Sequence, residues 1–316
     1  MTTRAAEREG TGTAGADGAA VPARVVGLVP PAEVPAEPAF AVASVMAKAD
    51  AENFTVASRL LPRAERDHLL AIYGFARLVD DVGDLAEGDR GAQLDWVEAE
   101  FDRALTGDAT HPVFRRLAAT IGAIGVGRQP FADLVRANRQ DQVVSRYATY
   151  EELAAYCRLS ADPVGRLVLA VFGRTDPLAV ELSDRVCTGL QLVEHWQDVA
   201  EDFAAGRVYL PEEDLSRFGV DEAVIASGAA TPAFRRLMSF ECARSARLLH
   251  AGAPLVGLLS GRARLAVAGF VGGGLAQLAA IESVGYDVLG HRAKAAKGSV
   301  ATHSLRVLLG RVGGRR

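Results

Sequence analysis

From about Val42 almost to the C-terminus, apolar residues recur at spacings of three and four positions, which is the period of an amphipathic helix. Alternating apolar and polar residues joined by hairpin turns, the pattern typical of strands, are missing. Half of the first 40 residues are Ala, Gly or Pro, and they follow neither period. The pattern therefore predicts a disordered leader over residues 1–40, one all-α domain over 41–310 and a short basic tail over 311–316.

Helix punctuation supports the all-α interpretation. Thr149, with Glu152 three residues later, has the spacing of a capping box. Asp162, Asp176 and Thr231 each precede a proline. We expect each of these three residues to be the N-cap of a helix that carries proline in its first turn.

Composition narrows the classes of function. Hydrophobic residues make up 49% of the chain, and because much of this content is Ala, Leu and Val, it favours helices. The net charge of −4 gives no general attraction for nucleic acid, so we expect no nucleic-acid partner. Three widely spaced cysteines and six scattered histidines match no zinc spacing. The cysteine usage favours a reducing compartment, and we expect a cytoplasmic protein.

Two stretches bear on membrane contact. The longest uncharged run, residues 265–281, contains four glycines and a glutamine, so we interpret it as a buried helix rather than a membrane span. No apolar segment follows the early charges, which argues against a signal peptide. The C-terminal SLRVLLGRVGGRR carries four arginines among leucine and valine. A peripheral contact with anionic lipid, at the inner face of the plasma membrane, and a frayed soluble tail are both open interpretations.

Two acidic clusters repeat one helical spacing. Asp80 and Asp84 are four residues apart, with Asp81 slightly to the side, and Asp198 and Asp202 repeat the interval more than a hundred residues later. On a helix, carboxylates at this spacing repel each other by a few tenths of a kcal/mol. Two such clusters, each beside apolar residues, indicate that a cation compensates the repulsion.

Mg²⁺ is the cation that such clusters favour, because it prefers oxygen ligands and is often completed by substrate phosphate. Two acidic helices facing each other across a helical bundle would bind Mg²⁺ and a diphosphate, while apolar helices enclose a hydrocarbon tail. The alternative is that the aspartates are solvated or paired with arginine, and Arg77 is within reach of Asp80 and Asp81. Residues 87–90, which follow the first cluster, are interpreted as solvated loop.

Four ordered blocks resemble the squalene/phytoene synthase family over about residues 50–290. They are ENFTVASRLLP (52–62), AIYGFARLVDDVGD (71–84), NRQDQVVSRYATYEELAAYCRLSADPVGRLVL (138–169) and GLQLVEHWQDVAEDFAAGRVYLPEEDL (189–215). Within the family, ENFTVAS and HWQDVAED most resemble the bacterial hydroxysqualene synthase branch of the hopanoid pathway. The resemblance implies an isoprenoid synthase helical bundle with a central active-site cavity.

The resemblance also implies roles for residues at matching positions. The implied catalytic residues are Tyr73, Asp80, Asp84, Asp198 and Asp202. The implied Mg²⁺ ligands are Asp80, Asp81, Asp84, Glu194, Asp198 and Asp202. The implied substrate contacts are Asn53, Phe54, Arg77, Asp141, Gln142, Arg207 and Tyr209. Glu194 departs from the family, which commonly has Asn there, and its role in metal binding or in water handling stays open.

For function, the resemblance implies Mg²⁺-dependent ionisation of presqualene diphosphate, rearrangement of the cation and its capture by water as hydroxysqualene. It also implies two pathway partners, an enzyme that makes presqualene diphosphate and a flavin-dependent reductase. Head-to-head prenyl condensation, giving presqualene diphosphate or phytoene, is the alternative within the enzyme class. A catalytically inactive helical scaffold is the alternative outside it, and two intact aspartate clusters disfavour it.

Overall fold

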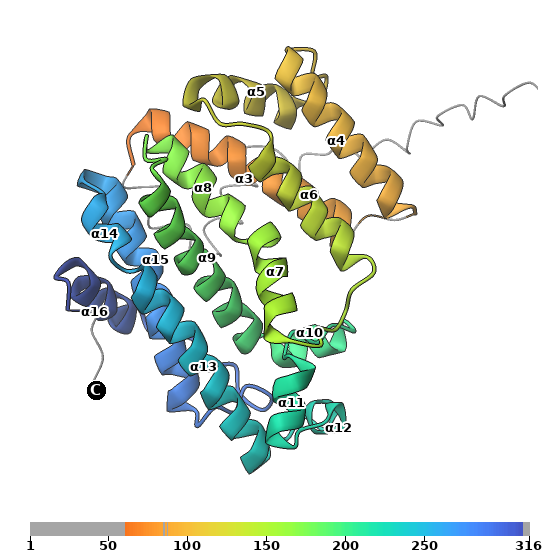
Figure 1. Ribbon diagram of the computed structural model, residues 1–316, viewed down its shortest axis with the longest axis vertical. Helices are drawn as coiled ribbons and strands as arrows, with labels where there is room; N and C mark the ends of the chain where they lie inside the picture. Colours follow the sequence, from red (N-terminus) through yellow and green to blue (C-terminus); the bar gives the residue numbers. More distant parts are fainter. Residues whose placement is uncertain (1–60, 85, 87, 312–316) are drawn as a thin grey trace, which may run out of the picture.

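The computed structural model describes residues 61–84, 86 and 88–311, and it folds them into a bundle of α-helices (Figure 1). The helices are α3 (Arg63–Asp84), α4 (Arg90–Thr106), α5 (Pro112–Ile124), α6 (Gln129–Asp141), α7 (Tyr150–Ser160), α8 (Asp162–Val171), α9 (Pro177–Gln197), α10 (Val199–Ala204), α11 (Glu212–Phe218), α12 (Glu222–Ala226), α13 (Pro232–Gly252), α14 (Leu255–Leu258), α15 (Gly261–Ser283) and α16 (Lys297–Leu308). This part of the chain contains no β-strand, so the all-α prediction is confirmed. The predicted leader, Asn53 and Phe54 lie outside the described residues.

Helix starts follow the predicted caps with one exception. Thr149, Asp176 and Thr231 each accept a hydrogen bond from the backbone N–H three residues further on. The prediction for Asp162 is wrong, because the residue before it is the N-cap and Asp162 is the first residue of α8. The Asp162 side chain is buried instead and accepts a hydrogen bond from Thr188 Oγ1 at 2.8 Å. Asp162 therefore bonds to a distant residue on α9 instead of capping its own helix.

The stretch after α3 is not loop throughout. Asp89 is the N-cap of α4, and its carboxylate accepts a hydrogen bond from the N–H of Ala92 at 3.0 Å. Arg90 begins α4 and donates to the backbone oxygens of Asp84 and Ala86. The interpretation of these two residues as solvated loop is therefore wrong, because they fasten the start of α4 to the end of α3. Glu87 lies outside the described residues.

Two apolar cores flank the middle of the bundle. One lies among α3, α4, α5 and α6, where the ring of Phe75 packs against those of Phe101, Phe114 and Phe131 with centroids 5.3–5.8 Å away. The other lies among α7, α9, α13 and α15 and includes the fully buried Trp196, whose Nε1 donates to a serine on α13. Both cores bury side chains that stand at helical spacing, and together they fix α3 and α6 relative to α7 and α9.

The helix α15 contains the long uncharged run. By length and composition it could cross a membrane, but 56% of its most apolar window is buried inside the bundle. A Cβ at Gly272 would lie 2.4 Å from the backbone N of Ser304, so this glycine lets α16 approach α15 closely. The burial agrees with the interpretation of this run as a core helix.

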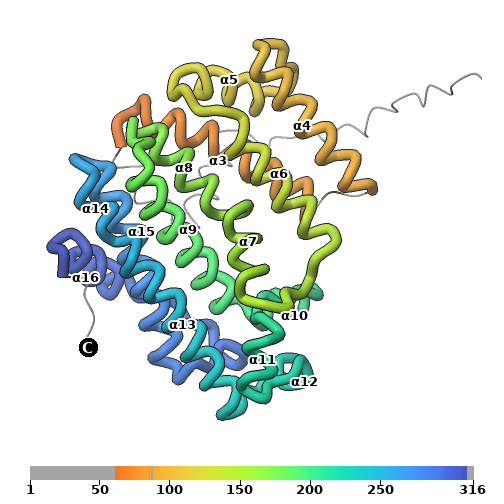
Figure 2. Tube along the Cα trace, in the orientation of Figure 1, coloured from red at the N-terminus to blue at the C-terminus, as the bar shows by residue number. Residues whose placement is uncertain are grey.

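The loop after α6 runs beside the segment that follows α10 (Figure 2). The N–H of Val208 donates to the carbonyl of Ser145 at 2.9 Å, and a single parallel β-bridge joins Arg146 to Val208. Arg146 also donates from Nε and Nη2 to the two carboxylate oxygens of Glu222 on α12. This contact places the sequence Arg207–Tyr209 next to the end of α6.

Candidate active site

A cavity of about 350 Å³ lies where α3, α6, α7, α9 and α10 converge. Six carboxylates line it: Asp80, Asp84, Asp141, Glu194, Asp198 and Asp202. The other lining residues are Leu134, Ala137, Asn138, Tyr156, Ser160, Gln191, His195, Arg207 and Tyr209. The two acidic clusters, more than a hundred residues apart in the sequence, therefore open into one cavity.

The first acidic cluster divides between the cavity and the helix surface. Asp80 and Asp84 line the cavity, as their four-residue spacing predicts. Asp81 does not line the cavity. Its Oδ1 forms an ion pair with Arg77 Nη2 at 2.7 Å. Asp81 is therefore paired with arginine, as the alternative interpretation of the cluster expects. Neither Asp81 nor Arg77 is among the residues that line the cavity. Their predicted metal and diphosphate roles stay predictions.

Asn138 is a cavity residue that sequence reasoning missed. Its Nδ2 donates to Asp80 Oδ1 at 3.1 Å, and it is buried on α6. A Cβ added at Gly83 would lie 2.2 Å from Asn138 Oδ1, so only glycine lets the two helices come this close. Gln142 donates to the backbone oxygens of Gly83 and Asn138, at 3.0 and 2.9 Å, and does not line the cavity. Gln142 thus holds the helix pair that positions Asp80, and its predicted substrate contact stays a prediction.

The second acidic cluster lies at a break between two helices. The helix α9 ends at Gln197, Asp198 has non-helical dihedral angles, and α10 begins at the next residue. The N–H of Asp202 still donates to the carbonyl of Asp198 at 2.8 Å, so the one-turn spacing is preserved. Glu194 is exposed one turn earlier and also lines the cavity.

Loss of water around the cavity carboxyls raises their pKa values. Burial raises the pKa of Asp80 and of Asp141 to about 6 and that of Asp202 to about 7. Although Asp80 is solvent-accessible through the cavity, protein surrounds it on most sides, which accounts for its shift. The pKa of Asp198 is also raised, again mainly by burial. Since like charges add to these shifts, the cavity favours an added cation.

Arg207 is the arginine that lines the cavity, and it links the two halves. Its Nη2 lies 2.7 Å from Asp84 Oδ1, across 123 positions of sequence. Its own N–H donates to the carbonyl of Asp202. The family resemblance implies that Arg207 contacts the substrate. In the structure, Arg207 joins the second acidic helix to the first, and it also lines the cavity.

An aromatic wall stands beside the carboxylates. The rings of His195 and Tyr209 stack at a centroid distance of 3.7 Å and an interplanar angle of 15°, and Tyr156 packs against both. Tyr156 Oη donates to Asp141 Oδ2 at 2.8 Å. Burial lowers the pKa of His195 to about 3, so its imidazole is neutral at physiological pH. The sequence analysis named Tyr209 and Asp141 as substrate contacts but gave no role to Tyr156 or His195.

The remaining predicted residue is Tyr73. It is half-buried on α3, two turns before Asp80, and is not among the residues that line the cavity. Arg292, from the segment between α15 and α16, has its Nη2 3.4 Å from Glu201 Oε1, near the second acidic cluster.

The donor set fits Mg²⁺ that arrives with a ligand. Among residues 61–84, 86 and 88–311, no group of three His, Cys, Asp or Glu side chains stands close enough to hold a metal ion by itself. Mg²⁺ in proteins is commonly held by one or two carboxylates, with waters and substrate phosphates completing the shell. Carboxylates on both sides of the cavity, with pKa values raised mainly by burial and further by neighbouring carboxylates, fit that kind of site and not a closed protein cage.

Comparison with known proteins identifies the family of this chain. The family profile described as squalene/phytoene synthase matches residues 47–299. The hydroxysqualene synthase of Rhodopseudomonas palustris is 36% identical over 208 residues, which cover 65% of this chain and 70% of the relative. The phytoene synthase of Mycobacterium tuberculosis is 31% identical over 252 residues, covering 78% of this chain and 83% of the relative.

Solved structures agree with the sequence comparison. The crystal structure of squalene synthase HpnC from Alicyclobacillus acidocaldarius is similar with a TM-score of 0.74 and 43% identity, over 78% of this chain and 94% of that one. A dehydrosqualene synthase structure has a TM-score of 0.76, covers 84% of this chain and 94% of its own, and at 23% identity speaks for the fold alone. The protein belongs to the squalene/phytoene synthase family, whose members act on prenyl diphosphates.

Proposed function

We propose that this protein converts presqualene diphosphate to hydroxysqualene in a Mg²⁺-dependent reaction. The observation that carries the proposal is the single cavity lined by carboxylates of both acidic helices, with Arg207 between them. Similarity to a hydroxysqualene synthase and to a squalene synthase supports this product class.

The proposed reaction balances without an oxidant or reductant. The bond between carbon and the diphosphate oxygen breaks, and the electron pair leaves with the diphosphate. The cyclopropylcarbinyl cation rearranges to a linear C30 cation, a water oxygen bonds to it, and one proton is released. Presqualene diphosphate and water therefore give hydroxysqualene, diphosphate and a proton.

The protein's own groups divide this work. Asp80, Asp84, Asp198 and Asp202 are the proposed metal-holding residues, with Glu194 at the edge of the same set. When bound, Mg²⁺ supplies positive charge that stabilises the departing diphosphate. Arg207 adds a fixed positive charge beside Asp84.

The aromatic wall acts on the hydrocarbon side. Stacked faces of Tyr209 and neutral His195 offer π electrons to a carbocation, a contact that benefits from exclusion of water. Tyr156 holds the Asp141 carboxylate at the same wall, and that carboxylate is a proton acceptor within the cavity. We assign the protein to the cytoplasm, between an enzyme that supplies presqualene diphosphate and a flavin-dependent reductase that consumes the alcohol.

Head-to-head condensation of two allylic diphosphates is the second candidate. It is favoured by the similarity to phytoene synthases, which extends over more of this chain than the match to the hydroxysqualene synthase. Both reactions need two acidic helices around a diphosphate, so the cavity alone does not separate them. The catalytically inactive scaffold is disfavoured, because both acidic clusters line the cavity.

Incubation of the purified protein with single substrates separates the candidates. The protein with Mg²⁺ is supplied with presqualene diphosphate in one reaction and farnesyl diphosphate in another, and the lipid extracts are analysed. We expect hydroxysqualene from the first and little consumption in the second. Efficient consumption of farnesyl diphosphate would support condensation and overturn the proposal.

A further inference from the structure

One end of the bundle carries a surface that the proposed reaction does not use. It combines exposed leucines and arginines from the start of α15 and the end of α16: Arg262, Leu265, Leu305, Arg306, Leu309 and Arg311. A hydrogen bond from Arg264 Nη2 to the carbonyl of Leu308, at 3.0 Å, holds the two helix ends together. We call these six residues the α15–α16 face.

The leucines of this face are unusually exposed. Leu305 and Leu309 are each 56% exposed and stand one turn apart, on the last turn of α16 and at its C-cap, while Leu265 is 47% exposed on α15. The other large apolar side chains with comparable exposure, Leu105, Val143 and Leu178, stand singly on other parts of the described chain. Scattered exposed leucines are ordinary, but three at one end of the bundle indicate a contact surface.

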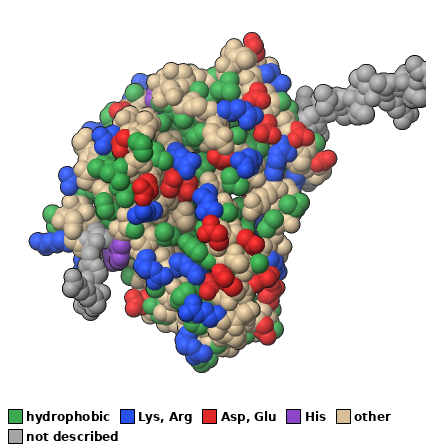
Figure 3. Space-filling view, in the orientation of Figure 1, with side chains coloured by type: hydrophobic (Ala, Val, Ile, Leu, Met, Phe, Trp, Pro, Cys, Tyr) green, Lys and Arg blue, Asp and Glu red, His purple; other side chains and the backbone are tan. Residues whose placement is uncertain are grey.

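The charged residues that flank these leucines in the sequence are all basic. The sequence contains no Asp or Glu over residues 251–281 or over 288–316. In Figure 3, blue side chains mark the left edge of the molecule around α14 and α16, whereas red side chains are densest at the lower right, over α10–α12. The α15–α16 face is therefore complementary to a negatively charged partner, although the whole protein carries a net charge of −4.

A second cavity opens beside the face. It has a volume of about 400 Å³ and lies between α13, α15 and α16. Arg306 and Arg311 line it together with apolar side chains that include Ala246, Leu275 and Leu278, and Glu282 is the acidic residue among its lining. Arginines next to an apolar wall suit an amphiphile with a negatively charged head and a hydrocarbon chain.

We propose that the α15–α16 face docks this protein on a bilayer that contains anionic phospholipid. The leucines enter the boundary between headgroups and acyl chains, and the arginines contact lipid phosphates. The second cavity receives part of one lipid. Docking places the enzyme where apolar molecules of the C30 class partition, but the inference stands on surface chemistry and holds whichever product the enzyme makes.

Vesicle co-sedimentation tests the docking with the full-length protein. Vesicles of phosphatidylcholine with about a third phosphatidylglycerol are compared with pure phosphatidylcholine at physiological salt. We expect binding to the anionic vesicles alone, weakened by raised salt. The Arg306→Gln/Arg311→Gln variant should lower the partition coefficient roughly 25-fold, about fivefold for each charge.

A matched variant separates local contact from net charge. Arg115→Gln/Arg236→Gln removes two exposed arginines from α5 and α13, changes the net charge by the same amount and should bind like the unmodified protein. An equal loss in both arginine variants would overturn the assignment of the face, as would absence of binding to anionic vesicles.

The leucines are tested in the same way. Leu305→Ser/Leu309→Ser should lower partition about tenfold, whereas Leu105→Ser/Leu178→Ser, at similarly exposed positions on α4 and α9, should not. Circular dichroism verifies that each variant is folded. Turnover of detergent-solubilised substrate should be unchanged in all four variants, so failure of docking and failure of the proposed reaction give different results.

Discussion

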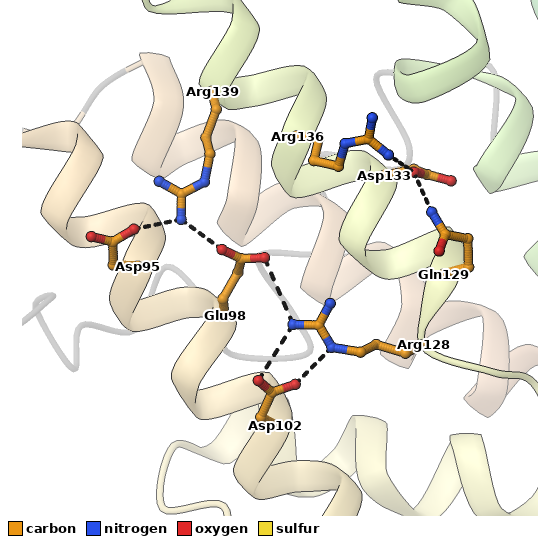
Figure 4. A network of polar contacts seen from close by, with 8 residues as sticks. All are labelled: Asp95, Glu98, Asp102, Arg128, Gln129, Asp133, Arg136 and Arg139. Atoms are coloured by element: carbon orange, nitrogen blue, oxygen red, sulfur yellow. Dashed lines mark hydrogen bonds and ion pairs between the residues drawn. The ribbon is translucent and has the colours of Figure 1, made fainter.

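Two groups of acidic side chains in this protein differ in how far nearby arginines balance their negative charge. On α4 and α6, Asp95, Glu98 and Asp102 alternate with Arg128 and Arg139, with most nitrogen–oxygen distances between 2.6 and 3.7 Å (Figure 4). In the cavity, six carboxylates share one lining arginine. Each carboxylate of the first group is paired with an arginine of the protein, so this group needs no added cation.

The pKa values express the same contrast. The hydrogen bonds that Arg128 and Arg139 donate to the acids raise the pKa of both arginines, which means that folding favours these ion pairs. In the cavity the pKa values of Asp80, Asp141 and Asp202 rise, which means that folding disfavours their charges. Single buried acids such as Asp162 and Glu241 also have raised pKa values. What distinguishes the cavity is that several such carboxylates share one space, which fits a cationic ligand.

The largest effect is expected from neutralising the cavity acids. Asp80→Asn and Asp198→Asn should each lower kcat about 10³-fold, because each removes charge that holds the metal and diphosphate. Thermal unfolding should occur at an unchanged or higher temperature, because like-charge repulsion is relieved. Glu98→Gln, in the α4–α6 network, should leave kcat unchanged. A fully active Asp80→Asn/Asp198→Asn double variant would refute the metal-site assignment.

Ligand binding should stabilise the cavity and not the network. Saturating Mg²⁺ with inorganic diphosphate, at about 100 times Kd, should raise Tm by about 5–10 °C, measured by scanning fluorimetry. Chelation by EDTA should reverse the shift. Glu98→Gln should keep it and Asp80→Asn should lose most of it. An equal shift in the Asp80→Asn variant would show that the ions bind elsewhere.

Without metal, stability should rise as pH falls from 8 to 6.5. Carboxyl groups whose folded pKa lies above the unfolded value bind extra protons in the folded state, so their cost is present at high pH and is relieved through the folded pKa. Asp202, at about 7, contributes in this window, as do the buried Asp162 at about 7 and Glu241 at about 8. Below pH 6.5, the lowered pKa of His195 acts in the opposite direction, because the unfolded imidazole then gains the proton.

The Asp202→Asn variant measures how much of this pH dependence of stability comes from the cavity. The variant should lose up to about 1 kcal/mol of the change in unfolding free energy between pH 8 and 6.5, measured by urea denaturation in EDTA. The contributions of Asp162 and Glu241 to the pH dependence of stability should remain. A wild-type stability that falls from pH 8 to 6.5 would contradict the raised pKa values.

Close packing of α3 on α6 should matter for both activity and stability. Gly83→Ala brings a methyl group into Asn138 Oδ1, which should cost about 1–3 kcal/mol in unfolding free energy and about tenfold in kcat. Gly122→Ala, on α5 with open space around it, should be neutral or slightly stabilising. Adding Asn138→Ala to Gly83→Ala should recover stability but not kcat. Additive losses in the double variant would argue against the contact.

The smallest effect is expected in the network. Arg128→Gln should lower the unfolding free energy by less than about 1 kcal/mol, because Arg128 and Asp102 are exposed and Glu98 is only half-buried. The loss should shrink at high salt and leave kcat unchanged. A drop in kcat would mean that the network and the cavity are coupled.

The parts of the site that could be predicted from sequence are those with local periodicity. Asp80, Asp84, Asp198 and Asp202 stand one helical turn apart, and the structure places all four at one cavity. The all-α fold was predictable for the same reason. The N-caps Thr149 and Thr231 are also local, because each binds an N–H three residues away.

The parts that could not be predicted depend on contacts between distant segments. Asn138 is one polar residue on an amphipathic helix, and only the glycine opposite it brings it to Asp80. The link from Arg207 to Asp84 spans 123 residues and leaves no pattern in either segment. Asp162 has the sequence of an N-cap, but a tertiary hydrogen bond from Thr188 outweighs the local preference.

The most direct test of the account is turnover of presqualene diphosphate in ¹⁸O-labelled water, with Mg²⁺ and without any reductant. The account predicts hydroxysqualene that carries one ¹⁸O atom, together with an equal amount of diphosphate. Mass spectrometry of the lipid extract measures the label. An unlabelled alcohol, a hydrocarbon product formed only when NADPH is added, or no consumption of presqualene diphosphate would contradict the account.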